Sequence, residues 1–204
     1  MKKLLIVLLS VGSWLTAFSQ EKGSFELGIV GGYNASTAQS GQLTNVNYLS
    51  AFNAGISGDY FFSDRWSIKA KLSYDQKGWA DGFITIDNGP SVTTDYKLNY
   101  LTIPVMANWH FGKKRNWYLN FGPYAGILLD AKETELEMDL KDFMQSTDFG
   151  LALGIGVKIP VAERIKILIE FDGQSGITDI IKDNTGNTIR NIRSSINTGL
   201  AFEL

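Results

Sequence analysis

The sequence predicts an all-β protein, an eight-stranded antiparallel up-and-down transmembrane β-barrel. Three observations lead to this fold class. Apolar residues recur at every second position in about eight segments, which is the period of a strand and not that of a helix. The connections between the segments alternate between short and long. Aromatic residues gather at those segment ends that meet at the short connections.

Each expected strand has one apolar and one polar face. In RWSIKAKLSYDQK (65–77), Trp66 and Leu72 lie on the face opposite Lys69 and Lys71. The same alternation predicts seven further strands at 25–34, 51–62, 100–112, 117–129, 148–160, 164–174 and 194–204. An even number of antiparallel strands is typical of a closed barrel in the bacterial outer membrane.

The lengths of the connections predict an orientation. Short turns are expected at 63–64, 112–116 and 161–163. Long loops are expected at about 35–50, 78–95, 130–147 and 175–193. Outer-membrane barrels have short periplasmic turns and longer extracellular loops. We therefore expect the long loops to face the outside.

The aromatic residues indicate which solvent meets the apolar face. Those at the short-turn end are Phe25, Tyr60, Phe62, Trp66, Trp109, Phe111, Trp117 and Phe202. A second row at the opposite end is expected to contain Tyr33, Phe52 and Tyr74. Aromatic girdles mark the two headgroup levels of a membrane barrel, whereas the core of a soluble barrel would not confine its aromatics to strand ends. The apolar face is therefore expected to contact lipid.

Pro104 interrupts the clearest strand, YLTIPVMANWHFG (100–112). A closed barrel has no edge strand, so this proline removes a ladder hydrogen bond wherever it lies. By parity Pro104 belongs to the inward set, with Thr102 and Met106. We expect a local bulge or lumen water to compensate.

The N-terminal segment is typical of a secretory signal peptide, and the domain prediction is a signal peptide at 1–19 followed by a barrel domain at 20–204. Two lysines precede an apolar run, and small residues precede Gln20. The run is shorter than the ~20 residues that a spanning helix needs. No cysteine occurs, which excludes a lipid-modified N-terminus and a disulfide framework.

Composition and motifs exclude several function classes. Without the leader, 17 of the 19 basic residues remain against 21 acidic ones, which argues against a nucleic-acid partner. One histidine, no cysteine and no G-x-S-x-G motif leave no predicted catalytic, cofactor or metal residue. The acidic segment 130–143 is expected to be a solvated loop with one helical turn. Two alternatives remain open, a lipid-active barrel enzyme built around His110 and a soluble periplasmic barrel that holds an apolar ligand.

The candidate site is a network of charged residues on the polar face. In an eight-stranded barrel the interior is only wide enough for side chains. Charges of mixed sign are expected to pair there and to close the lumen, so that the barrel conducts little. The predicted network comprises Lys69, Lys71, Asp75, Lys158, Glu170 and Asp172.

The order YLTIPVMANWHFG, YLNFGPYAGILL, DFGLALGIGVKIP and a final strand that ends in GLAFEL resembles the PorT-like group of outer-membrane β-barrel proteins of Bacteroidetes. The resemblance implies an outer-membrane location and contacts with outer-membrane lipids and the barrel-assembly machinery. It also implies a possible role as a secretion accessory. A partner on the outside or in the envelope, bound by the long loops, is the other expectation. The chain ends in Leu204 where such barrels often end in an aromatic residue, and Phe202 is expected to serve instead.

Overall fold

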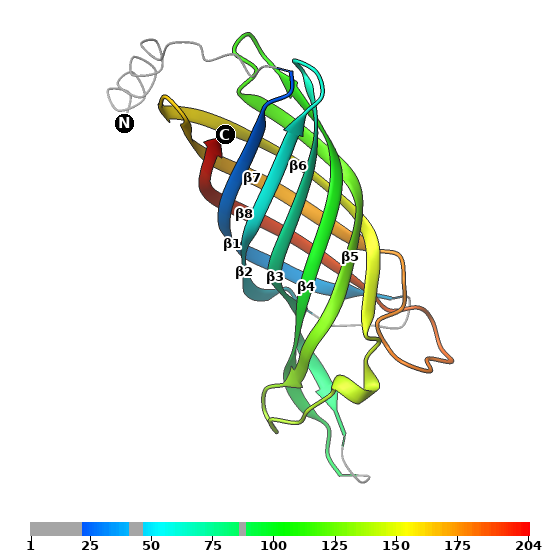
Figure 1. Ribbon diagram of the computed structural model, residues 1–204. Coiled ribbons are helices and arrows are strands. Elements are labelled where there is room, and N and C mark those ends of the chain that lie inside the picture. Colours follow the sequence, from blue (N-terminus) through cyan, green and yellow to red (C-terminus); the bar gives the residue numbers. More distant parts are fainter. Residues whose placement is uncertain (1–21, 41–46, 86–88) are drawn as a thin grey trace.

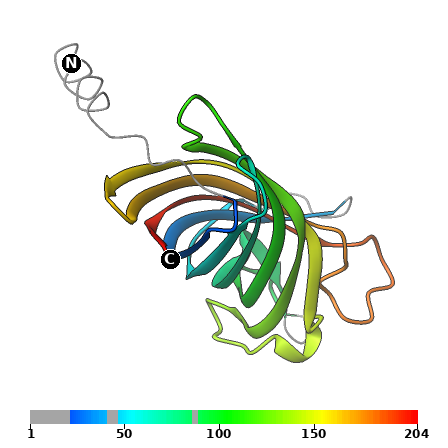
Figure 2. The ribbon, with the colours of Figure 1, turned by 45° about the horizontal axis from the view of Figure 1, so that its top comes forward.

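The computed structural model describes residues 22–40, 47–85 and 89–204, and within them eight strands form a closed antiparallel barrel (Figure 1). Each strand pairs with the next, and β8 pairs with β1, so that the first and last strands lie side by side in Figure 2. The predicted fold class is therefore confirmed. The expected signal peptide lies outside the described residues. The strands are β1 Phe25–Gln39, β2 Leu49–Phe61, β3 Trp66–Ile84, β4 Val92–Phe111, β5 Trp117–Glu133, β6 Thr147–Ala162, β7 Ile165–Gly176 and β8 Arg190–Glu203.

The alternation of the sequence appears in the structure as alternating burial. In β6, Leu151 and Leu153 are 60% and 58% exposed on the outer face, whereas Ala152 and Lys158 are buried inside. This distribution, with aliphatic side chains exposed and charged ones buried, is the reverse of that in a soluble protein. The outer face is therefore suited to lipid.

The aromatic residues at the short-turn end form a continuous row on the outside of β3, β4 and β5. The ring centroids of Trp66 and Trp109 are 6.4 Å apart, and those of Trp109 and Phe111 are 5.1 Å apart. Trp117 continues the row at 6.5 Å from Phe111. This is the expected girdle. At the long-loop end, Phe52 and Tyr74 pack with their centroids 5.6 Å apart.

Pro104 is buried in the lumen, as its parity predicts. The β3–β4 register lapses between Ala70, paired with Val105, and Ser73, paired with Thr102. No extra residue is inserted there, so the expected bulge is wrong. The residue pairs before and after this gap share one register. They hold β3 and β4 together where Pro104 has no N–H to donate.

The strands of the β3–β4 hairpin are longer than expected. Most of the predicted loop 78–95 is strand, because β3 continues to Ile84 and β4 begins at Val92. The other three predicted loops are likewise shortened by extensions of β1, β5 and β8. In these extensions the simple rule fails, because apolar side chains such as Trp79 and Leu98 lie inside together with polar ones such as Thr94 and Asn191. The strand prediction relied on a continuous apolar outer face, so it assigned these extensions to loops.

The interior at the long-loop end is an apolar cluster, here called the mouth cluster. Leu140 and Met144 from the β5–β6 segment and Ile180 from the β7–β8 segment enter the barrel and are buried. The expected helical turn, the 3-10 helix η1 at Lys141–Phe143, lies between the first two. These residues pack on the strand residues Ala38, Trp79, Leu98, Tyr100, Leu128 and Ala131.

Candidate functional site in the barrel interior

The middle of the lumen holds a charged cluster around Glu170. Lys69 on β3 donates to the Glu170 carboxylate of β7 at 2.6 Å. Lys71, two residues along β3, donates to the other oxygen of the same carboxylate and to Asp172 at 3.1 Å. Asn120 adds a hydrogen bond to Glu170 at 2.9 Å. The alternation of β3 and β7 places these side chains on the inner face, where they meet across the barrel.

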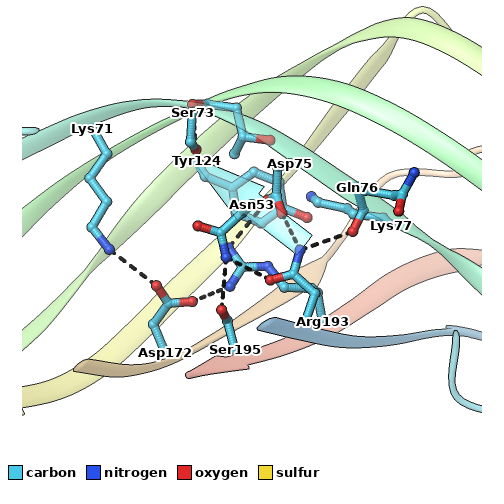
Figure 3. Close-up of polar contacts among 12 residues, drawn as sticks. Asn53, Lys71, Ser73, Asp75, Gln76, Lys77, Tyr124, Asp172, Arg193 and Ser195 are labelled. Atoms are coloured by element: carbon cyan, nitrogen blue, oxygen red, sulfur yellow. Dashed lines mark hydrogen bonds and ion pairs between the residues drawn. The ribbon is translucent and has the colours of Figure 1, made fainter. Parts of the chain in front are cut away.

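Arg193 extends this cluster toward the long-loop end (Figure 3). Its guanidinium pairs with Asp172 and, at 3.2 Å, with Asp75. Asp75 also accepts a hydrogen bond from Asn34 at 2.9 Å. Sequence reasoning missed Arg193 because its segment was read as the end of a loop. The alternation of Asn191, Arg193 and Ser195 across RNIRSSIN was the available signal.

A second cluster fills the short-turn end. Lys158 on β6 pairs with Glu26 of β1 and, at 2.7 Å, with Asp59 of β2. Lys166 on β7 pairs with Glu26 at 2.5 Å and with Glu203 of β8 at 3.0 Å. The two carboxylates Glu26 and Asp59 were not among the predicted site residues. Their parity, opposite to the apolar set of their strands, could have revealed them.

A third cluster lies below the mouth cluster. Lys77 donates to Asp148 at 3.0 Å, and its ammonium lies over the rings of Tyr124 and Tyr100 at 4.3 and 5.2 Å from their centroids. Asn191 donates to the same carboxylate at 3.0 Å. The lysine is thus held between a carboxylate and two aromatic faces, which is a favourable environment for a buried cation.

The structure places all six predicted residues inside the lumen and in ion pairs with one another or with residues that sequence reasoning missed. Over the described part of the chain, these clusters join six cations to six buried carboxylates. The cations are Lys69, Lys71, Lys77, Lys158, Lys166 and Arg193, and the carboxylates are Glu26, Asp59, Asp75, Asp148, Glu170 and Asp172. Buried charges are tolerated when they are paired and hydrogen-bonded in this way.

The lumen has almost no free space near its middle. A cavity of about 10 Å³ lies between Lys71, Pro104, Met106 and Asp172. That is room for about one water molecule. At this level the described side chains therefore leave little free space in the barrel.

The only histidine of the sequence, His110, lies in the lumen and is fully buried. Its Nε2 is 3.0 Å from the Ser67 hydroxyl, which is equally buried. The rings of Phe61 and Tyr118 pack on the imidazole at centroid distances of 4.8 and 5.9 Å. Within the described residues Nδ1 has no hydrogen-bond partner, so no carboxylate orients the ring. A serine and histidine enclosed in this way lack the access to substrate that nucleophilic catalysis needs.

Other kinds of site were also sought. In residues 22–40, 47–85 and 89–204, no group of three or more histidines and carboxylates is arranged to hold a metal ion. Over the same residues, no helix has the length and apolar character to cross a bilayer.

Comparison with known proteins identifies the fold and the family of this chain. No curated protein sequence matches this chain. The structure is similar to the outer membrane protein OprG from Pseudomonas aeruginosa, with 13% identity, a TM-score of 0.56 and coverage of 91% of this chain and 98% of that one. It is also similar to Neisserial surface protein A, with 18% identity, a TM-score of 0.54 and coverage of 89% and 99%. Residues 18–182 match the family described as "Outer membrane protein beta-barrel domain". The chain therefore belongs to this family of outer-membrane β-barrel proteins.

Proposed function

We propose that this protein is a closed barrel that anchors a binding surface in the outer membrane and presents it to the outside. Neither transport nor catalysis is part of the proposal. The observation that carries it is the contrast at the long-loop end, where buried loop residues fix a surface that also exposes large apolar side chains. Several large apolar side chains exposed to water at one end of a molecule favour an interaction site there.

The fixed part of this surface is the mouth cluster, which anchors the β5–β6 and β7–β8 segments inside the barrel. The exposed part includes Phe143, 64% exposed on η1, and Phe83, 58% exposed near the end of β3. Leu136 and Met138, on the β5–β6 segment, are also exposed. Segments held in one conformation lose little entropy on binding, which favours recognition by this end.

A test of the binding surface uses intact cells that express the full chain. Phe83→Ser with Phe143→Ser should reduce the retention of cells on a surface coated with basement-membrane matrix. Lys141→Ser, a polar change on the same η1 helix, is the matched control and should retain wild-type adhesion. Equal retention of the wild type and the double variant would contradict the binding role.

The closed lumen has a separate test in planar lipid bilayers. The purified wild type should give no stable single-channel steps, because paired charges and Met106 fill the middle of the barrel. Large steps from the monomer would show that the lumen conducts.

The orientation has its own test. A tag inserted at Asn184, in the β7–β8 segment, should be accessible to antibody on intact cells, and a tag at Lys114, in a short turn, should not. Labelling of the tag at Lys114 instead would show that the barrel has the opposite orientation in the membrane.

Two finer assignments belong to this proposal. Membership in the PorT-like group would make the same surface a contact for a secretion machine, and deletion of the gene should then reduce the export of secreted proteins. Contact with the barrel-assembly machinery would use the C-terminal strand, where Phe202 lies near the end of β8. Phe202→Ser with unchanged assembly would argue against that role.

A further inference from the structure

A groove of about 710 Å³ crosses the outer wall of the barrel on β5, β6, β7 and β8. Its sides are large apolar side chains that point outward, namely Leu119, Phe121, Leu151, Leu153, Phe171 and Ile192. Gln174 and Arg193 also border it, but their side chains are buried in the lumen, so they meet the groove with their backbone. We call this feature the wall groove. Its volume lies within the range of ~300–1,000 Å³ that is usual for small-molecule sites.

Short side chains on β7 and β8 keep the wall groove open. One row of register partners runs along it, from Ser194 through Gly173 and Leu153 to Phe121. A Cβ added at Gly173 would meet only the Arg193 carbonyl oxygen, at 3.8 Å, so the space above this glycine is open. Ser175, two residues along β7, is also short. The groove therefore lies where small residues are surrounded by large apolar ones.

The wall groove slants across the membrane. Phe121 lies four residues from Trp117 of the short-turn girdle, whereas Ser194 lies eight residues from Phe202 of the same girdle. On β1, Ser194 pairs with Ala35, which is two residues beyond the aromatic Tyr33 toward the long-loop end. The serine end is therefore near the headgroup level, and the other end is within the hydrocarbon. Neighbouring strands are ~4.8 Å apart, so the groove spans about 14 Å from β8 to β5.

Two hydroxyl groups face the upper end of the wall groove. Ser194 lies opposite Gly173, and Ser175 lies opposite Ile192 on the same outer face. Among the described residues, neither hydroxyl has a hydrogen-bond partner. A polar group that faces hydrocarbon without a partner costs free energy, so an occupant with a hydrogen-bond acceptor at this level is favoured.

The shape of the groove favours a flexible chain over a second copy of the protein. A two-fold dimer places the same surface patch of each copy against the other. Two such grooves facing each other would leave a void, whose lining loses packing contacts. The family places the barrel in the outer membrane, where the wall is surrounded by lipid chains.

We propose that the wall groove binds one acyl chain of an outer-leaflet lipid. The chain lies along the row from Ser194 to Phe121. Its ester carbonyl, which an acyl lipid carries at the headgroup end of the chain, accepts hydrogen bonds from the Ser175 and Ser194 hydroxyls. The choice of leaflet rests on the proposed orientation, which the tags at Asn184 and Lys114 test independently.

The direct test uses the purified full chain in lipid nanodiscs. The probe is phosphatidylethanolamine with a photoreactive diazirine on one ester-linked acyl chain, and mass spectrometry maps the cross-linked residues. In the wild type, cross-links should concentrate on the groove residues of β6, β7 and β8. Gly173→Leu fills the groove and should reduce these cross-links to the level found on β2 and β3, because the packing contacts that hold a chain in lipid are lost.

The chain offers a matched control for this variant. Gly31 lies on the outer face of β1, and a Cβ there would meet only the Asn53 carbonyl oxygen, at 3.7 Å. Gly31→Leu is the same change in an equally open position outside the groove, and it should cross-link as the wild type does. Both variants should keep their heat-modifiable gel mobility, which shows that the barrel is folded.

A second experiment tests the two hydroxyl groups. Ser175→Ala with Ser194→Ala should weaken binding of the ester-linked lipid in detergent by about tenfold, since two hydrogen bonds are lost. Native mass spectrometry counts the bound lipid. An ether-linked lipid of the same chain length has no carbonyl and should bind the wild type and the variant equally weakly. Thr198→Val removes a hydroxyl elsewhere on the outer face of β8 and should leave binding unchanged.

Four results would contradict the proposal. Cross-links spread evenly over the strands of the wild type would indicate ordinary lipid contact without a site. Wild-type cross-linking of Gly173→Leu would place the chain elsewhere. Equal binding of the ester-linked and ether-linked lipids to the wild type would exclude the hydrogen bonds from the serines. A wild-type dimer that Gly173→Leu dissociates would make a second copy the occupant.

Discussion

The barrel has two interiors of opposite character. Between the aromatic girdles the inside is charged and the outside is apolar, as at Glu170 and its outward neighbours Ile169 and Phe171. At the long-loop end the inside is apolar, as at Leu98 and Ile180, and the outside carries both polar and apolar side chains, such as Lys132 and Phe83. The same strands, β3, β4 and β5, run through both parts without a break.

The difference shows that the surrounding solvent decides what the inside of this barrel contains. In lipid the apolar side chains gain nothing from turning inward, so the interior is left to groups that must avoid hydrocarbon. In water the hydrophobic effect applies again, and the interior becomes an ordinary core. The long-loop part is therefore expected to respond to substitution as a soluble domain does, and the embedded part as a network of buried charges does.

The largest effect is expected from Glu170→Lys. It would leave Lys69 and Lys71 without their shared carboxylate and add a third cation. Removal of one partner from a buried ion pair costs about 3–5 kcal/mol, and charge reversal exceeds this. Urea unfolding in lipid vesicles, followed by heat-modifiable gel mobility, measures the loss. If the reversal prevents folding, Glu170→Gln should still fold and show a smaller loss in the urea midpoint. The control is the exposed loop change Glu135→Lys, which should leave the midpoint near that of the wild type.

A smaller and local effect is expected from Ile180→Ala in the mouth cluster. Ile180 is fully buried, and an isoleucine-to-alanine change in a core costs about 2–5 kcal/mol. The loss should release the β7–β8 segment, residues 177–189, while the embedded part keeps its heat-modifiable mobility. Protease cleavage on intact cells measures the release. Ile177→Ala, 60% exposed in the same segment, should leave cleavage unchanged. Unfolding of the whole barrel by Ile180→Ala would show that the two parts are not separable.

The shared outer face should contribute less than either interior. Trp109→Leu removes the ring contacts with Trp66 and Phe111. Such aromatic contacts are worth about 0.5–1.5 kcal/mol, so the urea midpoint should fall only modestly. Val105→Leu, on the same outer face of β4 but without a ring contact, is the control. A loss as large as that of Glu170→Gln would contradict this ranking.

The smallest effect is a pH response at the long-loop end. Burial disfavours the charge of Glu133, but hydrogen bonds from the Met138 N–H, the Thr94 hydroxyl and the Leu136 N–H outweigh it and hold its pKa below the ordinary value. Because folding lowers this pKa, the carboxylate stabilises the segment above the pKa of the unfolded chain. That contribution is lost as the pH falls through the lower folded value.

The amide shifts of Leu136 and Met138, followed by NMR in bicelles during an acid titration, measure this response. They should move together at a pH below the ordinary range of a glutamate. Glu133→Gln should abolish the shared transition. Its persistence in the variant would assign it to another group.

The embedded part could be predicted from the sequence, because lipid on one face and a narrow lumen on the other impose a strict alternation. The parity of Lys69 and Glu170 was enough to place both inside. The pairing of Lys71 with Arg193 through Asp172 was not predictable, since it depends on which strands meet across the barrel.

The structure of the long-loop part was predicted less accurately from the sequence, for a physical reason. From Gly78 to Ile84 the alternation is irregular, with Trp79 buried and Phe83 exposed, and the register shifts between Trp79 and Gly82, so neither face is apolar along the whole segment. Leu140, Met144 and Ile180 resemble scattered loop residues, and only the folded barrel brings them into one cluster.

The ion pairs also have a consequence for how the barrel assembles. Glu26 meets Lys166 across 140 residues of chain, next to the seam where β1 joins β8. A slip of one residue at that seam would turn every side chain of the strand to the other face and take Glu26 away from Lys158 and Lys166. Both lysines would then lose a buried partner, which is costly. The charged interior therefore disfavours closures in which the first strand is one residue out of register.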